Sequence, residues 1–266
     1  MATLIDTHAH LDDGRFDGDR AEVLARAEAA GLERVIAVGT TGASSRDVLS
    51  LAEASPLVYA AVGIHPDSAA EAGPGDWDEV VRLASDPRVR GIGETGLDRY
   101  RDRTPFAVQE ESFRRHLELG RALDLCVVIH CREADEDVLR LLREQFARHG
   151  PIRAVLHSFT GGVAAAAEAV AMGLHVSLAG MLTYKTAADV RAMAKSVPPE
   201  RLLVETDCPY LSPEPVRGRR NEPAHVVHTA ACLAGLHGLS PEAMAEVTTR
   251  NARALFKLPS PAGGGP

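Results

Sequence analysis

Short apolar runs rich in β-branched residues alternate with longer amphipathic segments along the whole chain. The apolar runs predict eight strands, at Thr3–Thr7, Arg34–Val38, Leu57–Val62, Val89–Gly93, Cys126–Ile129, Arg153–Leu156, Leu174–Leu178 and Arg201–Glu205. The amphipathic segments predict helices at Arg20–Ala30, Asp76–Ala84, Val108–Leu123, Ala134–Phe146, Val163–Met172 and Ala187–Ser196, with terminal helices near 224–236 and 241–255. This alternation predicts parallel strands joined by right-handed crossovers.

Eight strand–helix units in about 250 residues favour a closed (β/α)₈ TIM barrel of the α/β class over an open doubly wound sheet. A GxGxxG phosphate turn, which the open sheet would carry after its first strand, is replaced by His8-Ala9-His10. We expect one domain over residues 1–258. Residues 208–223 predict a long loop rich in Pro and Arg, and residues 259–266, made of Gly, Pro, Ala and Ser, predict a disordered tail.

Composition narrows the class of protein. The 266 residues are 45% hydrophobic and 25% charged, which suits a globular protein with a sizeable core. The start of the chain does not resemble a signal peptide, and no run of about 18 apolar residues is present, so no membrane partner is expected. The four cysteines are too irregularly spaced for a disulfide framework or a CxxC zinc site, and reduced thiols fit a cytoplasmic location.

Polar residues follow the predicted strands at the end where a TIM barrel carries its functional groups. Six of them have side chains that bind divalent cations: His8, His10, Glu94, His130, His157 and Asp207. Imidazoles with carboxylates are typical of hydrolytic sites that hold Mg²⁺, Mn²⁺ or Zn²⁺. Any one of these residues alone is more often structural, but burying all six together without a cation would be destabilising.

The set is large enough for two divalent cations. We expect His8, His10 and Asp207 around one cation, the imidazoles of strands five and six around the other, and Glu94 between them. Two cations about 3.5–4 Å apart need an anion between them to offset their repulsion, and a carboxylate supplies one oxygen to each.

Three further residues near the same strand ends have two interpretations. His65, after the third strand, is expected either to contact substrate or to cap its loop. Asp6 and Glu205 are expected either to orient the imidazoles or to be internal polar residues of the barrel.

Together with the motifs around them, these residues resemble a known family. The motifs are Ile5–Leu11 (IDTHAHL), Gly63–Pro66 (GIHP), Gly91–Asp98 (GIGETGLD), His130–Arg132 (HCR), His157–Gly161 (HSFTG), Glu205–Leu211 (ETDCPYL), Asn221–Pro223 (NEP) and Asn251–Phe256 (NARALF). In this order, over about residues 4–256, they resemble the TatD-type metal-dependent deoxyribonucleases of the amidohydrolase-like barrel proteins.

The resemblance implies a divalent-metal nuclease acting on DNA, often described as a 3′→5′ exonuclease linked to DNA repair or fragmentation. It implies the same six metal ligands. Many binuclear amidohydrolases bridge their metals with a carboxylated lysine from the fourth or fifth strand. The only lysines here are Lys185, Lys195 and Lys257, so Glu94 is left for that role. Position 99, often aromatic in relatives, is Arg99.

The expected activity is hydrolysis of DNA phosphodiester bonds by water activated between two metals. Asp207 is expected to accept the proton of that water, with Glu94 and His65 as the other catalytic residues. The expected partner is DNA, single-stranded or at a 3′ end and held by its backbone, and no obligate protein partner is predicted.

Net charge and aromatic content limit how DNA can be held. The net charge of −8 argues against a protein that coats polyanions, so basic residues must gather on one face. The expected substrate contacts are His65, Arg99, Tyr100, Arg132 and Arg219, on a face shared with Arg101, Arg103, Arg217 and Arg220. Aromatic residues make up only 4% of the chain, which argues against a long stacking platform; Tyr100, Phe159 and Tyr184 are candidates to stack on one terminal base.

Two alternatives remain open. The same metals would serve an amide or ester hydrolase, such as an aminoacyl-tRNA deacylase, whose activity on neutral carbonyl substrates would respond little to salt. A noncatalytic barrel scaffold would need no metal and would tolerate the loss of His8 and His10.

Overall fold

The computed structural model describes residues 3–259 and shows eight parallel strands hydrogen-bonded in the order β1 to β8. The strands are β1 (Leu4–Ala9), β2 (Leu32–Val38), β3 (Val58–Val62), β4 (Val89–Asp98), β5 (Cys126–Arg132), β6 (Ala154–Leu156), β7 (His175–Leu178) and β8 (Leu202–Val204). The circle closes where Ala9 at the end of β1 pairs with Cys208 just after β8. The predicted (β/α)₈ barrel is therefore confirmed.

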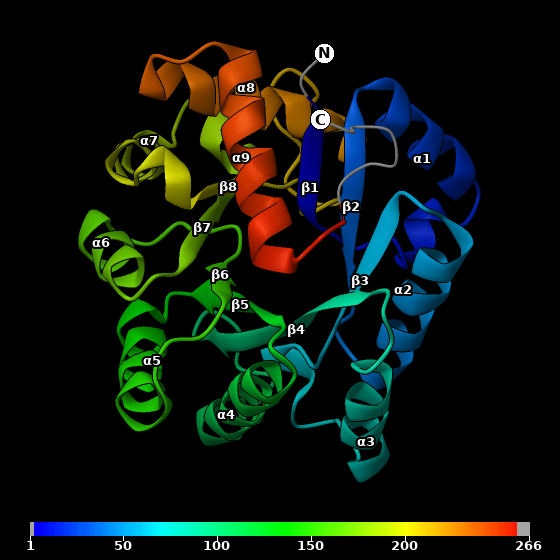
Figure 1. Ribbon diagram of the computed structural model, residues 1–266, viewed down its shortest axis with the longest axis vertical. Coiled ribbons are helices and arrows are strands. Elements are labelled where there is room, and N and C mark those ends of the chain that lie inside the picture. The colour runs from blue at the N-terminus through cyan, green and yellow to red at the C-terminus, as the bar shows by residue number, and fades with distance from the viewer. Residues whose placement is uncertain (1–2, 260–266) are drawn as a thin grey trace.

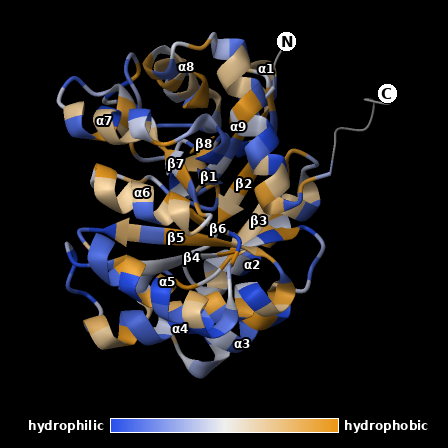
Figure 2. Ribbon diagram, turned by 60° about the vertical axis from the view of Figure 1, so that its left-hand side comes forward, coloured by the Kyte–Doolittle hydropathy of each residue, from blue (hydrophilic) through white to orange (hydrophobic). Residues whose placement is uncertain are grey.

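Helices surround the ring of strands in Figure 1. They are α1 (Arg20–Ala29), α2 (Gly42–Ala54), α3 (Pro74–Leu83), α4 (Phe106–Leu123), α5 (Asp135–His149), α6 (Val163–Ala171), α7 (Ala188–Ser196), α8 (Val226–His237) and α9 (Pro241–Phe256). In Figure 2 the helices carry both hydrophobic and hydrophilic residues, while the strands are largely hydrophobic. None of the helices in residues 3–259 has the length and apolar character needed to cross a membrane.

Two apolar layers hold the barrel together. The larger lies between strands and helices, where strand residues such as Val35 and Val127 pack with helix residues such as Leu117. The smaller lies inside the barrel, where Tyr59 packs in the same cluster as Phe256 from the last turn of α9. Because α9 crosses in front of β8 and β1 in Figure 1 and its end fills the start of the barrel, the carboxyl ends of the strands are left for the polar residues.

Helix α2 is absent from the helices expected from the sequence. It opens with Gly-Ala-Ser-Ser, a composition typical of loops. A reciprocal cap stabilises this start: the Ser44 backbone N–H donates to the Thr41 hydroxyl at 3.1 Å, and the Thr41 N–H donates to the Ser44 hydroxyl at 3.0 Å. The local hydrogen bonds therefore outweigh the weak helix propensity of these residues.

Strand β4 is longer than predicted, since it runs to Asp98 rather than ending at Gly93. Its pairing with β5 shifts register after Ile92, resumes at Thr95 and continues to Asp98 opposite Arg132. Glu94 consequently lies within the strand and not beyond its end. Of the expected tail 259–266, Pro259 follows α9 without regular structure, and 260–266 lie outside the described residues.

Candidate metal centre

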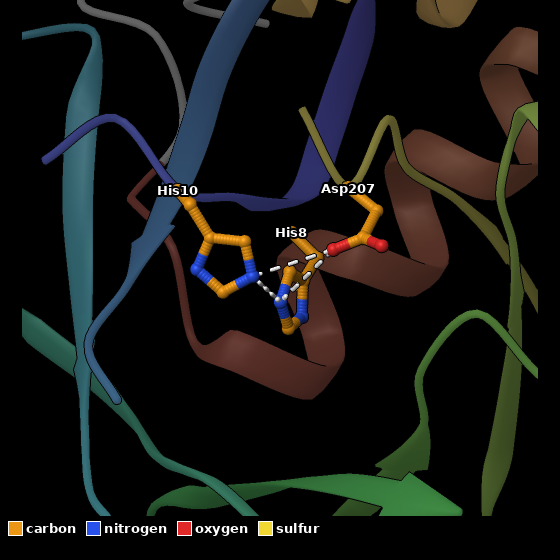
Figure 3. Close-up of side chains that lie close together, drawn as sticks. All are labelled: His8, His10 and Asp207. Carbon is orange, nitrogen blue, oxygen red and sulfur yellow. Dashed lines mark hydrogen bonds and ion pairs between the residues drawn. The ribbon is translucent and has the colours of Figure 1, made fainter. Parts of the chain in front are cut away.

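The six side chains expected to bind metal come together at the carboxyl end of the barrel. Five of them line a cavity of about 760 Å³, and His8 lies fully buried against four of these five. Figure 3 shows His8, His10 and Asp207, with the Nε2 atoms of both imidazoles turned toward one carboxylate oxygen.

The first group joins the two ends of the barrel sheet. Nε2 of His8 lies 3.3 Å from Nε2 of His10 and 3.8 Å from Oδ1 of Asp207, and the His10–Asp207 distance is 3.4 Å. The chain segments are held side by side because the Asp207 N–H donates to the His8 carbonyl at 2.9 Å and the His10 N–H donates to the Cys208 carbonyl at 2.8 Å. Residues 199 positions apart thus lie together at the strand ends, where the sequence placed them as expected ligands, and the group could hold a metal ion.

Glu94 lies between this group and the imidazoles of β5 and β6. Its Oε2 is 3.3 Å from Nε2 of His8 and 3.6 Å from Nε2 of His10. Its Oε1 is 2.8 Å from both Nδ1 of His130 and Nε2 of His157. Each oxygen of one carboxylate therefore faces a different pair of imidazoles, which is the arrangement that a bridging ligand requires.

Three of the four imidazoles use their second nitrogen in a hydrogen bond to oxygen. Nδ1 of His10 donates to the Val38 carbonyl at 3.2 Å, and Nδ1 of His157 donates to the Glu205 carboxylate at 3.3 Å. Nε2 of His130 donates to Oδ2 of Asp98 at 3.0 Å. When such an imidazole is neutral it carries one proton, so the lone pair of its other nitrogen would face Glu94 and could bind a cation.

His8 completes the set in a different way. Its Nδ1 is buried and has no hydrogen-bond partner within residues 3–259, and the same is true of Oε2 of Glu205. His8, His157 and Glu205 each offer an atom within 4.8 Å of the others. Buried polar atoms left without partners are costly in a protein without a bound group, and this donor set of imidazoles and carboxylates fits a divalent cation.

The charges of the cluster show why it favours cations. Burial alone would raise the pKa of Glu94, but the imidazoles of His157, His65 and His130 outweigh burial and hold it well below its usual range. Burial would likewise lower the pKa of His10, yet Asp207 and Glu94 raise it to about 9. The carboxylates therefore attract positive charge, which protons supply when no cation is bound and which a metal ion would replace.

His65 caps its loop, which is one of the two roles expected of it, and its ring also lines the cavity, while its contact with substrate stays a prediction. Its Nδ1 accepts the Asp67 N–H at 3.1 Å and so caps the turn that follows β3, while its Nε2 lies 3.5 Å from Oε1 of Glu94. Burial lowers the pKa of His65 to about 4, so the ring is neutral near pH 7. With Nδ1 accepting, the single proton of the neutral ring is on Nε2, the nitrogen 3.5 Å from Glu94. His65, Glu94 and His130 also offer atoms within 4.8 Å of one another, a spacing that could hold a metal ion.

Asp6 and Glu205 have different contacts in the structure. Glu205 contacts the His157 ring, as expected of a residue that orients an imidazole. Asp6 touches no imidazole: it accepts the backbone N–H groups of His8 and Thr206 and the Thr206 hydroxyl. Asp6 therefore fastens β1 to the segment after β8, and the internal structural role applies to it.

A glycine sets the distance between β4 and β5 beside the centre. Gly96 pairs with His130 and has a φ of +139°, a conformation that side chains rarely adopt. A Cβ at this position would meet the His130 carbonyl oxygen at 2.0 Å. The Gly-rich motif after Glu94 is therefore needed for the close approach of the strand that carries His130.

Only some of the arginines predicted on the substrate face line the cavity among the described residues. Arg101, Arg103 and Arg132 line the cavity. Arg99 pairs with Asp137 at 2.6 Å and, like Arg219, is outside the lining residues. The contact roles of these residues with substrate stay predictions.

The remaining members of the expected face are held by their neighbours. Arg217 lies over the Tyr184 ring and Arg220 pairs with Asp19. Tyr100 is 61% exposed beneath the Arg132 guanidinium, which is 3.8 Å from its ring centre. Phe159 is buried, so it packs in the rim instead of offering a face to a base.

Two features of the site were not singled out in the sequence. Asp98 fixes His130, and its position four residues after Glu94 on the same strand is the signal that could have indicated it. Tyr210 lines the cavity, with its ring centre 6.0 Å from that of His10, and the Arg15 guanidinium lies 4.3 Å from the Tyr210 ring centre. Nothing in the local sequence pattern connects Arg15 with Tyr210.

Comparison with known proteins agrees with this geometry. The family model described as TatD related DNase matches residues 5–257. The chain belongs to the TatD family. It is 38% identical over 255 residues to the uncharacterized metal-dependent hydrolase YabD of Bacillus subtilis (strain 168), covering 96% of this chain and 99% of YabD. It is 34% identical over 260 residues to the 3′-5′ ssDNA/RNA exonuclease TatD of Salmonella typhimurium, covering 96% of this chain and 99% of that protein.

Among solved structures, the chain is similar to YJJV, the TatD homolog of Escherichia coli K12. The TM-score is 0.90 at 29% sequence identity, over 97% of this chain and 99% of YJJV. The family resemblance inferred from the motifs is thus confirmed, and this TatD family protein is a metal-dependent hydrolase.

Proposed function

We propose that this TatD family protein is a deoxyribonuclease that hydrolyses phosphodiester bonds from the 3′ end with two divalent cations, Mg²⁺, Mn²⁺ or Zn²⁺. The observation that carries the proposal is Glu94, whose two oxygens face separate imidazole pairs. The direction of cleavage is taken from relatives named as 3′-5′ exonucleases in Salmonella typhimurium and Edwardsiella piscicida.

Cations at this centre would polarise the phosphate and lower the pKa of water. His8, His10 and Asp207 would hold one, and His130 and His157 the other, with Glu94 shared. Two dications would carry four positive charges and would offset the four carboxyl groups of the centre, Glu94, Asp98, Glu205 and Asp207. An anionic backbone could then approach the centre of a protein whose formal net charge is −8.

Asp207 is the proposed proton acceptor. Burial would raise the pKa of its carboxyl group, but His10 outweighs burial and lowers it. The carboxylate is therefore ionised at neutral pH and lines the cavity where water must attack.

His65 is the proposed donor to a nonbridging phosphate oxygen. Its Nε2–H points into the cavity because Nδ1 is engaged by the Asp67 N–H. A donor fixed before substrate arrives stabilises the charge that develops on phosphate oxygens. Arg101, Arg103 and Arg132 line the same cavity and are the proposed contacts for the rest of the backbone.

The test is cleavage of DNA labelled at its 5′ or 3′ end, with each metal added singly to wild type and to Glu94→Gln. We expect the cleavage rate of Glu94→Gln to fall more than about 100-fold, because a neutral amide cannot bridge two cations as the carboxylate anion can. Glu246→Gln, on an exposed position of α9, is the matched control and should cleave like wild type. Equal cleavage by Glu94→Gln and Glu246→Gln would contradict the proposal.

Salt separates the nuclease from the amide or ester hydrolase considered above. Binding of a DNA backbone should weaken steeply as salt rises, whereas hydrolysis of a neutral aminoacyl ester should change little. Turnover of the ester with no cleavage of DNA under any metal would favour the other hydrolase.

A further inference from the structure

A second cavity lies at the opposite end of the barrel from the metal centre. Its volume is about 400 Å³, within the range of sites for small molecules. It opens at the starts of β5 to β8, beside the ends of α4 and α9. The residues that line it include Leu125, Arg153, His175, Arg201 and Leu255.

The charge of this cavity is opposite to that of the whole chain. Arg121, Arg153 and Arg201 line it, and among residues 3–259 Asp124 is the only acidic residue in its lining. Asp124 is also shared, because it accepts from both Arg153 and Lys257. A protein with a formal net charge of −8 thus carries an excess of positive charge at this point.

Two of the three guanidiniums keep donors for a ligand. Arg121 is occupied by the backbone carbonyls of residues 149–151. Arg153 donates from Nε to Asp124 and from Nη1 to the Ala254 carbonyl, which leaves Nη2. Arg201 donates only from Nη1, to the Gly173 carbonyl, so its Nε and Nη2 are without partners among residues 3–259.

His175 supplies a third donor side chain, at the start of β7, the strand between β6 and β8. Its side chain has no hydrogen bond to any described residue, although the residue is only 9% exposed. Burial and the nearby Arg201 lower the pKa of His175 to about 4, so the ring is neutral. Its Nδ1 is sealed from solvent, and an unpaired lone pair there costs less than an unpaired N–H. The proton is therefore on Nε2, the nitrogen left to face the cavity that His175 lines.

We propose that this cavity binds a small organic phosphate of the size of a nucleoside monophosphate, held by Arg153, Arg201 and the Nε2–H of His175. Three donor side chains at the starts of three different strands suit the three nonbridging oxygens of a phosphate monoester better than the two oxygens of a carboxylate. Leu125, Ile152 and Leu255 form an apolar wall for the organic part. The proposal does not depend on the nuclease activity.

The experiment follows the ring C–H resonance of His175 by NMR in the metal-loaded protein, assigned with His175→Gln. Titration with deoxyadenosine monophosphate should shift it saturably, inorganic phosphate should act more weakly, and benzoate should have no saturable effect. Anions that bind at the metal centre move other histidines and leave His175 unchanged, so the two sites are distinguished.

Arg153→Gln and Arg201→Gln should each weaken the binding by about tenfold or more. Arg82→Gln, which removes the same charge from an exposed position on α3, should leave it unchanged. The Arg153 side chain is 41% exposed, so Arg153→Gln still tests the proposal if Arg201→Gln fails to fold. The proposal is overturned if His175 shows no saturable shift, if benzoate binds as tightly as the nucleotide, or if Arg82→Gln weakens binding equally.

Discussion

At the residue scale, the chemistry of the metal centre depends on which nitrogen of each imidazole is already used. His10 and His157 donate from Nδ1 and turn Nε2 to Glu94, whereas His130 donates from Nε2 and turns Nδ1 to it. The partner of His65 donates to the ring instead, which leaves a proton on the nitrogen in the cavity. One residue type can therefore serve both as metal ligand and as donor, and the neighbouring atom sets which nitrogen is free for either role.

Glu205 should strengthen metal binding through His157. We expect Glu205→Gln to weaken metal affinity by about tenfold, because a neutral amide accepts the Nδ1–H less strongly and lowers the basicity of the ring. Calorimetric titration with metal measures the affinity, and excess metal should restore most of the rate. If metal binds with unchanged affinity, Glu205 does not act through His157.

At the element scale, helix α4 holds the turn that carries His65. Its His116 is fully buried, accepts the Ile64 N–H at Nε2 and donates from Nδ1 to the Ser112 carbonyl. Both hydrogen bonds need the neutral ring, since a proton on Nε2 would face the Ile64 N–H. Burial lowers the pKa of His116 to about 4 accordingly.

His116 should therefore make the fold sensitive to acid. The unfolded ring takes up a proton near pH 6.5 and the folded ring only near 4. The contribution of the neutral ring to the free energy of unfolding is therefore complete above pH 6.5 and is lost as pH falls toward 4. This lowers the free energy of unfolding by about 3 kcal/mol. Urea unfolding at a series of pH values should show that acid lowers the free energy of unfolding less in His116→Gln than in wild type. Glutamine keeps an acceptor near the position of Nε2 but does not take up a proton.

His149→Gln is the control for this measurement, because the His149 side chain makes no hydrogen bond within residues 3–259. It should follow the wild-type dependence on pH. An identical dependence in wild type and His116→Gln would show that His116 is not the responsible group.

At the scale of the whole molecule, the apolar residues that stabilise one end of the barrel lie apart from the residues proposed to react at the other end. The last turn of α9 packs Leu255 and Phe256 into the start of the barrel, while the expected metal ligands lie at the carboxyl ends of the strands. A change in this apolar end alters the free energy of unfolding without touching the reacting groups.

Phe256→Ala should lower the free energy of unfolding by about 3–5 kcal/mol, because it leaves a cavity where the side chain is 1% exposed. The kcat of the protein that stays folded should be unchanged. Urea unfolding and initial rates at low temperature measure the two effects separately. Val81→Ala, at a position 39% exposed, is the control and should change stability by less than about 0.5 kcal/mol. A fall in kcat for folded Phe256→Ala would show that the two ends are coupled.

The sequence by itself determined the barrel and which of the expected ligand residues gather at one end of it. Eight apolar runs separated by amphipathic segments favour parallel strands, and the carboxyl ends of parallel strands meet at one mouth. His8, Glu94, His130, His157 and Asp207 could therefore be grouped although they are distant in the chain. Local pattern missed α2 and the end of β4, because a helix cap and a register shift set those limits.

Only the tertiary structure decided the partners of each side chain. Distances across the fold determine which imidazoles each oxygen of Glu94 faces. They also determine the hydrogen bond from His130 to Asp98 and the ion pair of Arg99 with Asp137. The second cavity likewise combines strand starts and helix ends that share no motif. Sequence periodicity determines which face a residue occupies, but hydrogen bonds are set within a few tenths of an ångström by packing between elements.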